Sequence, residues 1–265
     1  MTFRTLGTLA LLTLTLGLWC AAAPSAAEPV PTTTTTAPST APQATKNPAA
    51  TPAWRPDNGG NWWSKIHDAN VELAKKGHID LLFTGDSITE GWQLNQNPWK
   101  KNFADFKPAN FAIRGDQTQH VLFRLQNGEF PNPAPKVVVL MIGTNNPHTA
   151  EETAGGITAI VHEIHKQSPT TKVLLLAIFP RGGTPEDKSR IKNQAVNALI
   201  AQLDDGKTVK YLDLGPKFLN PDGTPIKEAY APDTLHLAWK GYEIWADAIT
   251  PTLKELLVPP AATQK

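Results

Sequence analysis

Five short apolar runs, separated by longer stretches of mixed polarity, are the feature that most restricts how this sequence can fold. Four of the five runs consist mainly of Val, Ile, Leu and Phe, with little alternation between polar and apolar positions. Strands that are covered on both faces have this composition, because neither face meets water. The runs therefore predict buried strands over residues 79–83, 109–113, 137–142, 173–178 and 209–212.

The stretches around these runs have apolar residues at helical spacing. Strands that alternate with helices, joined by right-handed crossovers, predict an α/β domain: a three-layer α/β/α sandwich around a five-stranded parallel sheet. In such a sheet ligands bind outside the carboxyl ends of the strands, so we expect chemistry in the loops that follow the strands. The helices are predicted over residues 62–76, 118–125, 150–166, 185–203 and 237–257.

The amino-terminal part of the chain lacks this pattern. Residues 1–27 are typical of a secretory signal peptide, with a charged start, an apolar run of about 14 residues and a small-residue cleavage site. The run is shorter than the roughly 20 residues that a membrane-spanning helix needs. Cleavage after Ala27, or alternatively after Ala23, would release the protein outside the cell or into the periplasm. Cys20 offers a lipid anchor as an alternative, which the bulky Trp19 before it disfavours.

A disordered linker is predicted next, over residues 28–56. This stretch is rich in Pro, Thr and Ala, contains five consecutive threonines and has no apolar periodicity. It cannot bury enough apolar surface to offset the chain entropy lost on folding. The folded domain is predicted over residues 57–258, and a flexible tail over residues 259–265.

The charge balance and the cysteine count exclude several functions. The chain has 25 Lys and Arg against 24 Asp and Glu, a net charge of +1, so attraction to nucleic-acid phosphates is not expected to be its main activity. One cysteine cannot form an internal disulfide or supply a structural zinc site. The histidines lack a metal-ligand spacing, and we expect neither a metal nor an organic cofactor.

Four short polar blocks fall where predicted strands end or where the last predicted helix begins. A serine is a usable nucleophile only when a base accepts its proton, and the base is usually oriented by a carboxylate. Ser87, His236 and Asp233 supply these three groups. The blocks are Gly85-Asp86-Ser87-Ile88, Arg114-Gly115-Asp116, Gly143-Thr144-Asn145-Asn146 and Asp233-Thr234-Leu235-His236.

The same blocks contain donors for a developing oxyanion. Acyl transfer puts negative charge on the former carbonyl oxygen, and each preorganised donor stabilises that charge by roughly 3 to 4 kcal/mol. Ser87 and Gly115 offer backbone amides, and Asn145 offers its side-chain amide. Glycine at position 115 also permits close approach of the backbone to a substrate.

Together, the four blocks resemble those of the GDSL, or SGNH, hydrolase family. The likeness is to the branch that contains the catalytic subunits of platelet-activating-factor acetylhydrolase and many secreted bacterial carbohydrate acetylesterases. It covers all of the chain except the predicted signal and linker, and it implies a flavodoxin-like SGNH hydrolase fold. It also implies the role of nucleophile for Ser87, of oxyanion donors for Gly115 and Asn145, and of orienting acid and base for Asp233 and His236.

Asp86, Trp92, Arg114 and Arg181 are candidates for the wall of the pocket. Arg114 stands where this branch tends to have another glycine, so a charged side chain is expected beside the oxyanion site. Arg181 lies in a stretch that also resembles the branch and is expected to flank the cleft. Asp86 has an alternative role in accepting backbone hydrogen bonds of its loop, and Trp92 has one as a packing residue.

The sequence thus predicts a secreted serine esterase that removes short acyl groups, above all acetyl, from a carbohydrate. A lysophospholipase or a short-chain lipid esterase is the alternative within the enzyme class. A glycan-binding protein that uses the same cleft is the alternative outside it, although binding alone needs no nucleophile and base. Neither a nucleic-acid partner nor an integral membrane span in the mature protein is expected.

Overall fold

The structure is a computed structural model, and it describes residues 46–56 and 59–257. The predicted signal peptide, most of the predicted linker and the predicted tail lie outside the described residues. None of the helices within the two described ranges combines the length and the apolarity that crossing a bilayer requires.

A five-stranded parallel sheet forms the centre of the fold. Its strands are β1 (Leu81–Gly85), β2 (Pro108–Asn110), β3 (Val137–Met141), β4 (Lys172–Leu176) and β5 (Val209–Leu212). They lie in the order β2-β1-β3-β4-β5, and Leu81 pairs with Val137 across β1 and β3. The order reverses direction between β1 and β3, as in flavodoxin-like folds, which place their ligands at this point. The predicted fold class is confirmed.

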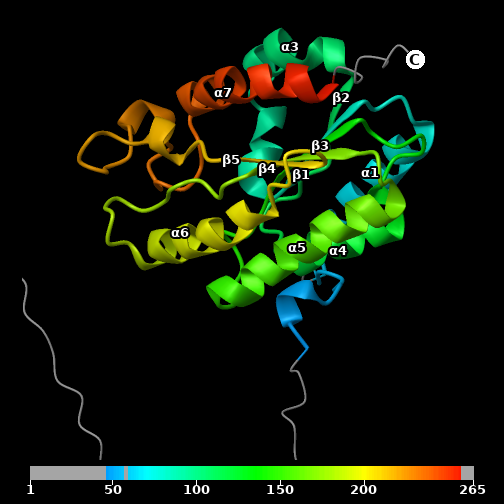
Figure 1. Cartoon of the computed structure of the whole chain (residues 1–265), viewed down its shortest axis with the longest axis horizontal. Coiled ribbons are helices and arrows are strands. Elements are labelled where there is room, and N and C mark those ends of the chain that lie inside the picture. Colours follow the sequence, from blue (N-terminus) through cyan, green and yellow to red (C-terminus); the bar gives the residue numbers. More distant parts are fainter. Residues whose placement is uncertain (1–45, 57–58, 258–265) are drawn as a thin grey trace, which may run out of the picture. The chain divides into compact units, whose positions relative to one another are not determined.

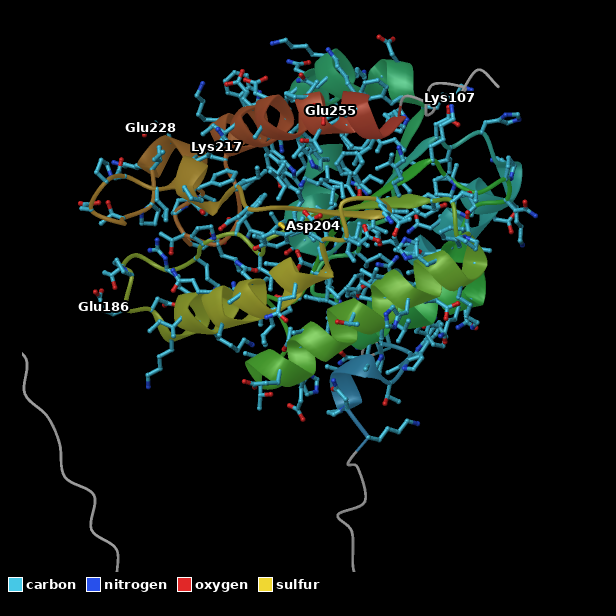
Figure 2. The ribbon with its side chains drawn as sticks, viewed as in Figure 1. Lys107, Glu186, Asp204, Lys217, Glu228 and Glu255 are labelled. Carbon is cyan, nitrogen blue, oxygen red and sulfur yellow. The ribbon has the colours of Figure 1, made fainter. Side chains whose placement is uncertain are left out.

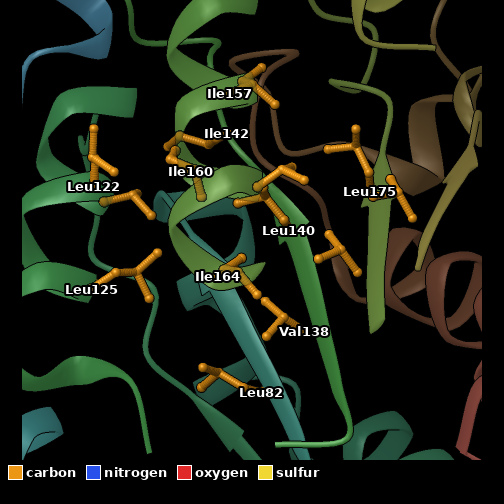
Figure 3. Close-up of a cluster of buried hydrophobic side chains, with 14 of the residues drawn as sticks. Leu82, Leu122, Leu125, Val138, Leu140, Ile142, Ile157, Ile160, Ile164 and Leu175 are labelled. Carbon is orange, nitrogen blue, oxygen red and sulfur yellow. The ribbon is translucent and has the colours of Figure 1, made fainter. Parts of the chain in front are cut away.

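Helices cover both faces of the sheet (Figure 1). They are α1 (Trp62–Lys76), α2 (Ser87–Glu90), α3 (Gln96–Phe103), α4 (Thr118–Arg124), α5 (Ala150–Gln167), α6 (Lys188–Ile200) and α7 (Trp239–Leu257). One face packs against α1, α4, α5 and α6, where aliphatic side chains such as Val138 and Leu140 of β3 lie near Ile160 and Ile164 of α5 (Figure 3). The other face packs against α3 and α7 and holds aromatic residues such as Trp245.

Capping residues set where several helices begin. Thr149 and Glu152 form a capping box at the start of α5, in which each side chain accepts the other residue's backbone N–H (3.1 and 3.0 Å). Asp187 caps α6 by accepting two backbone N–H groups (2.9 and 3.0 Å), so that helix begins later than predicted. The prediction missed α3 because Pro98 favours a loop reading, yet proline is tolerated in the first turn of a helix.

Charged side chains of both signs lie around the outside of the fold (Figure 2). Lys107, Glu186, Lys217 and Glu255 are exposed and come from four separate parts of the chain. This mixture follows from the nearly equal numbers of acidic and basic residues.

The predicted linker is wrong over residues 46–56, which we call the N-terminal strap. Its short helix, η1 (Pro48–Ala50), lies against α4 and α5 (Figure 1). Ala49 is completely buried, and its carbonyl oxygen accepts a hydrogen bond from Thr118 Oγ1 (2.8 Å). This part of the predicted linker is therefore an element of the folded domain.

Two adjacent glycines of α5 explain why composition misled the prediction. A side chain at Gly155 would collide with Asn47 Nδ2, and one at Gly156 would collide with the Ala49 carbonyl oxygen. The small residues of the strap fit against a helix face that the glycines leave open. The composition of the strap alone predicts disorder, because it does not include the surface of the folded domain against which the strap packs.

Candidate active site

Ser87 is the first residue of α2, directly after the turn that follows β1. Asp86 caps α2, because its Oδ1 accepts a hydrogen bond from the Ile88 N–H (3.0 Å). Glycine is needed at position 85, since a Cβ there would collide with the Met141 carbonyl oxygen of the neighbouring β3. This tight turn holds Ser87 at the carboxyl edge of the sheet, where the strand order reverses.

Ser87 is the first member of a line of three hydrogen-bonded side chains. Its Oγ lies 2.9 Å from Nε2 of His236, and Nδ1 of His236 lies 2.6 Å from Oδ2 of Asp233. When Nδ1 bears the proton and faces the carboxylate, Nε2 accepts a hydrogen bond from the Ser87 hydroxyl. The geometry therefore allows a proton to pass from Ser87 to His236.

The loop that carries Asp233 also holds its carboxylate in place. Oδ1 accepts hydrogen bonds from the backbone N–H groups of Leu235 and His236 (3.0 Å each). Burial would raise the pKa of Asp233, but the hydrogen bonds from the His236 side chain and from these backbone N–H groups lower it to about 2. The carboxylate is therefore ionised at neutral pH and can orient the imidazole.

The expected oxyanion donors line the same pocket as Ser87 and His236. Gly115 has a φ of +72°, in the region that favours glycine, and its N–H makes no hydrogen bond to any described residue. Asn145 Nδ2 donates one hydrogen to the Asp116 carbonyl oxygen (3.1 Å). The second amide hydrogen is left for a ligand in the pocket.

The pocket has a volume of about 630 Å³, and its lining includes residues that the sequence did not single out, among them Glu90, Leu94 and Tyr242. Helical spacing could have indicated Glu90, which follows Ser87 by three residues in the same helical turn. Leu94 follows a 3-10 turn (Gly91–Gln93), where α-helical spacing no longer applies. Tyr242 comes from α7, and only the tertiary fold brings it here.

Of the four predicted wall residues, Arg114 is the one that lines this pocket among the described residues. Trp92, five residues after the serine, points to the opposite side of the turn and is completely buried among aromatic side chains. Asp86 is buried beneath the turn as the cap of α2. Arg181 is held outside the pocket by a hydrogen bond to Thr144 Oγ1 (3.1 Å). As predictions of the pocket wall, these three were wrong.

The buried position of Asp86 changes its chemistry. Burial raises the pKa of Asp86 to about 7; the carboxylate of Asp116 acts in the same direction, whereas the hydrogen bond from the Ile88 N–H and the charge of His236 oppose the shift. A carboxyl group directly beneath the nucleophile therefore titrates near neutral pH.

Buried charges support the loop of residues 114–116, which we call the oxyanion loop. Asp116 is completely buried and accepts hydrogen bonds from Trp63 Nε1 (2.7 Å) and Arg124 Nε (2.8 Å). Arg124, itself buried, also forms an ion pair with Glu129. The sequence placed Asp116 in one of the blocks but gave it no role, because its partners are not recognisable from local spacing.

A serine, a histidine and an asparagine amide that meet at the switch point of a flavodoxin-like sheet are typical of SGNH-type hydrolases. In the described part of the chain, no group of three or more His, Cys, Asp or Glu side chains could hold a metal ion. The model of the GDSL-like Lipase/Acylhydrolase family matches residues 83–244, and the chain belongs to this family. The protein is therefore a hydrolase that acts on esters.

Curated relatives agree with this assignment, and a solved structure agrees with the fold. The chain is 39% identical over 216 residues to platelet-activating factor acetylhydrolase IB subunit alpha1 of Rattus norvegicus, covering 80% of this chain and 91% of that protein. It is 43% identical over 199 residues to the alpha2 subunit of Gallus gallus, covering 74% and 86% of the two chains. Its fold is similar to that of a GDSL-like lipase from Bacteroides thetaiotaomicron, with a TM-score of 0.61, 22% identity and coverage of 73% and 97%.

Proposed function

We propose that the protein hydrolyses acetyl and other short acyl esters, on a carbohydrate alcohol, through an acyl-enzyme on Ser87. The observation that carries this proposal is the unbroken line from Ser87 Oγ to His236 Nε2 (2.9 Å) and from His236 Nδ1 to Asp233 Oδ2 (2.6 Å), beside three amide donors.

In the first step Ser87 Oγ attacks the ester carbonyl carbon while its proton moves to Nε2 of His236. The imidazolium that forms is stabilised by Asp233, which does not itself take the proton. The carbonyl oxygen becomes an oxyanion, held by the backbone N–H groups of Ser87 and Gly115 and by the free hydrogen of the Asn145 amide.

In the second step the tetrahedral intermediate collapses, and Nε2 of His236 returns its proton to the leaving alcohol. The acyl group is now an ester on Ser87. Water then attacks this ester, with His236 as its base, and the same donors hold the second oxyanion. Release of the carboxylic acid returns the proton to Ser87 Oγ.

Polar residues on the pocket lining support a hydroxyl-rich alcohol as the leaving group. Glu90, Gln93, Asn95 and Arg114 offer donors and acceptors close to Ser87. The curated relatives are named acetylhydrolases, which supports acetyl as the acyl group. Export through the predicted signal peptide stays a prediction from residues 1–27 and would give the enzyme access to extracellular polymers.

A lipid ester is the second candidate substrate, and one residue favours it. Leu94 lines the pocket although the residue is 90% exposed. An exposed leucine at the mouth of a pocket could contact an acyl chain or another apolar group of a substrate.

Purified protein and its Ser87→Ala variant, tested on p-nitrophenyl acetate, decide between an esterase and a glycan-binding protein. We expect rapid release of nitrophenol by the wild type and slow release by the variant. Equal, slow release by both would contradict the catalytic role. Acetylated xylan, acetylated sialate and short-chain glycerides, compared with one enzyme preparation, then distinguish a carbohydrate from a lipid substrate.

A further inference from the structure

The N-terminal strap ends at the oxyanion loop, and Arg55 makes the contact. Its Nη1 donates a hydrogen bond to the Arg114 carbonyl oxygen and lies 3.4 Å from Oδ1 of Asp116. A Cβ at Gly115 would approach Arg55 Nη2 to 2.6 Å. The guanidinium group of Arg55 therefore packs directly against the backbone of the oxyanion loop.

The position of this hydrogen bond matters because of peptide geometry. The Arg114 carbonyl and the Gly115 N–H belong to one planar, trans peptide group, in which the two bonds point in opposite directions. Holding the carbonyl oxygen on the Arg55 side therefore directs the Gly115 N–H to the other side, and Gly115 lines the pocket there. A charged donor on the carbonyl also polarises the peptide and strengthens its N–H as a donor.

Contacts of the strap hold Arg55 in this position. The Ala53 N–H donates to the Gln119 carbonyl oxygen (3.1 Å), and the Trp54 ring packs edge-on against Trp63 (4.8 Å between centroids). The Arg55 guanidinium also lies over the Trp62 ring, 5.1 Å from its centroid. These contacts reduce the side-chain freedom that Arg55 would otherwise lose on binding the loop.

We propose that Arg55 is a positioning residue for the oxyanion hole, and that the end of the N-terminal strap that carries it therefore contributes to catalysis. Arg55 acts through the Gly115 peptide and does not touch the reacting atoms. This inference rests on the proposed esterase mechanism, because the Gly115 N–H has a catalytic role only if an oxyanion forms beside Ser87.

The test compares Arg55→Ala and Arg55→Gln with the wild type and with Lys46→Ala. Lys46 is an exposed cation of the same strap that forms no hydrogen bond or ion pair with any described residue, so its variant controls for the loss of a charge. We expect both Arg55 variants to lower kcat by between about tenfold and 100-fold with little change in KM, since a misplaced donor affects the transition state more than the bound substrate.

A boronic acid that forms a tetrahedral adduct with serine separates positioning from general stability. Its inhibition constant should rise in the Arg55 variants by the same factor by which kcat/KM falls, because both report on the oxyanion hole. Guanidinium ion, added far below concentrations that unfold proteins, should restore part of the activity of Arg55→Ala and none of that of Arg55→Gln, whose side chain fills the site.

Two results would overturn the inference. One is a kcat within about twofold of the wild type in both Arg55 variants. The other is a loss of activity that is accompanied by a lower Tm and in which the boronate inhibition constant does not rise by the factor by which kcat/KM falls. A wild type no faster than Ser87→Ala would instead refute the proposed function, so the two failures are distinguishable.

Discussion

Two loops flank Ser87, and they are held in place differently. The loop of residues 233–236, which we call the relay loop, is exposed: the side chains of His236 and Asp233 have 42% and 50% of their surface accessible. Apart from the hydrogen bonds that join His236 to Ser87 and Thr234 to Gly182, its hydrogen bonds join residues no more than five positions apart. The oxyanion loop is anchored by the completely buried Asp116, whose partners include residues more than 50 positions away.

The two loops should therefore respond differently when a side chain is removed. A locally bonded, exposed loop can lose a side chain without disturbing the core, because water replaces the lost partner. A loop held by buried charges cannot, because each partner removed leaves another charge buried and unpaired. We therefore expect changes on the relay side to affect rate alone, and changes behind the oxyanion loop to affect both rate and stability.

The largest effect on turnover is expected at Ser87 and at His236 of the relay loop. Ser87→Ala and His236→Ala should each lower kcat roughly 10,000-fold or more, since each removes a group on which both chemical steps depend. The Tm of both variants, measured by circular dichroism, should stay close to that of the wild type. A Tm lowered as far as by changes behind the oxyanion loop would show that the relay side is also structural.

Asn145→Ala should have the next largest effect, because it removes one oxyanion donor. We expect kcat to fall by about 100-fold to 1,000-fold with KM nearly unchanged. Steady-state kinetics with p-nitrophenyl acetate measure both. A rise in KM without a fall in kcat would mean that Asn145 binds the substrate rather than the transition state.

Arg124→Met tests the buried support of the oxyanion loop. The change leaves the carboxylates of Asp116 and Glu129 buried without their shared cation, so the free energy of unfolding should fall by about 3 to 5 kcal/mol. Turnover should fall about tenfold, because the loop is displaced rather than removed.

Urea unfolding measures this loss, and Lys240→Met provides the matched control. Lys240 pairs with Glu243 at the surface (3.1 Å), so breaking that pair should change stability by less than about 1 kcal/mol. Equal losses in the two variants would contradict the comparison between exposed and buried anchoring.

Asp86→Asn should have the smallest effect on turnover, a change of less than about threefold, because asparagine also serves as a helix cap. Its effect is on pH dependence. The folded pKa of about 7 lies above the unfolded value of 3.8, so between these values the folded protein holds a proton that the unfolded chain has released. The contribution of Asp86 to the free energy of unfolding should therefore decrease as pH rises from about 4 to about 7.

Asparagine at position 86 does not titrate, so the variant should lack this contribution over this range. Urea unfolding at a series of pH values tests this, with Asp68→Asn, a change at an exposed position of α1, as the control. If Asp86→Asn and the wild type share one slope, Asp86 is already ionised throughout the range.

The same comparison explains what the sequence could predict. Ser87, Asp233 and His236 stand in short blocks at strand and helix ends, and the structure brings them within hydrogen-bonding distance of one another. Local spacing carries that information because these groups are held by bonds to near neighbours. The sheet and most helices were predictable for the same reason, since their apolar periodicity is local.

The support of the oxyanion loop was not predictable, because it depends on contacts between distant segments. Arg55 stood in a stretch whose composition predicts disorder, and nothing in its neighbourhood indicates Arg114 as its partner. The prediction that Trp92 lines the pocket was wrong for a different reason. Trp92 is close to Ser87 along the chain, but the helical turn directs its side chain into the core. A position close to Ser87 in the sequence therefore predicts a place in the pocket only when the direction of the side chain in the helical turn is also taken into account.

The paired glycines of α5 affect how this part of the protein unfolds locally. Glycine within a helix weakens it by roughly 1 kcal/mol relative to alanine, so the first half of α5 is a poor helix without the strap that covers Gly155 and Gly156. The strap and this half-helix should therefore exchange their amide hydrogens with solvent as one cooperative unit. Protection of the oxyanion loop in a hydrogen-exchange measurement should rise and fall with them.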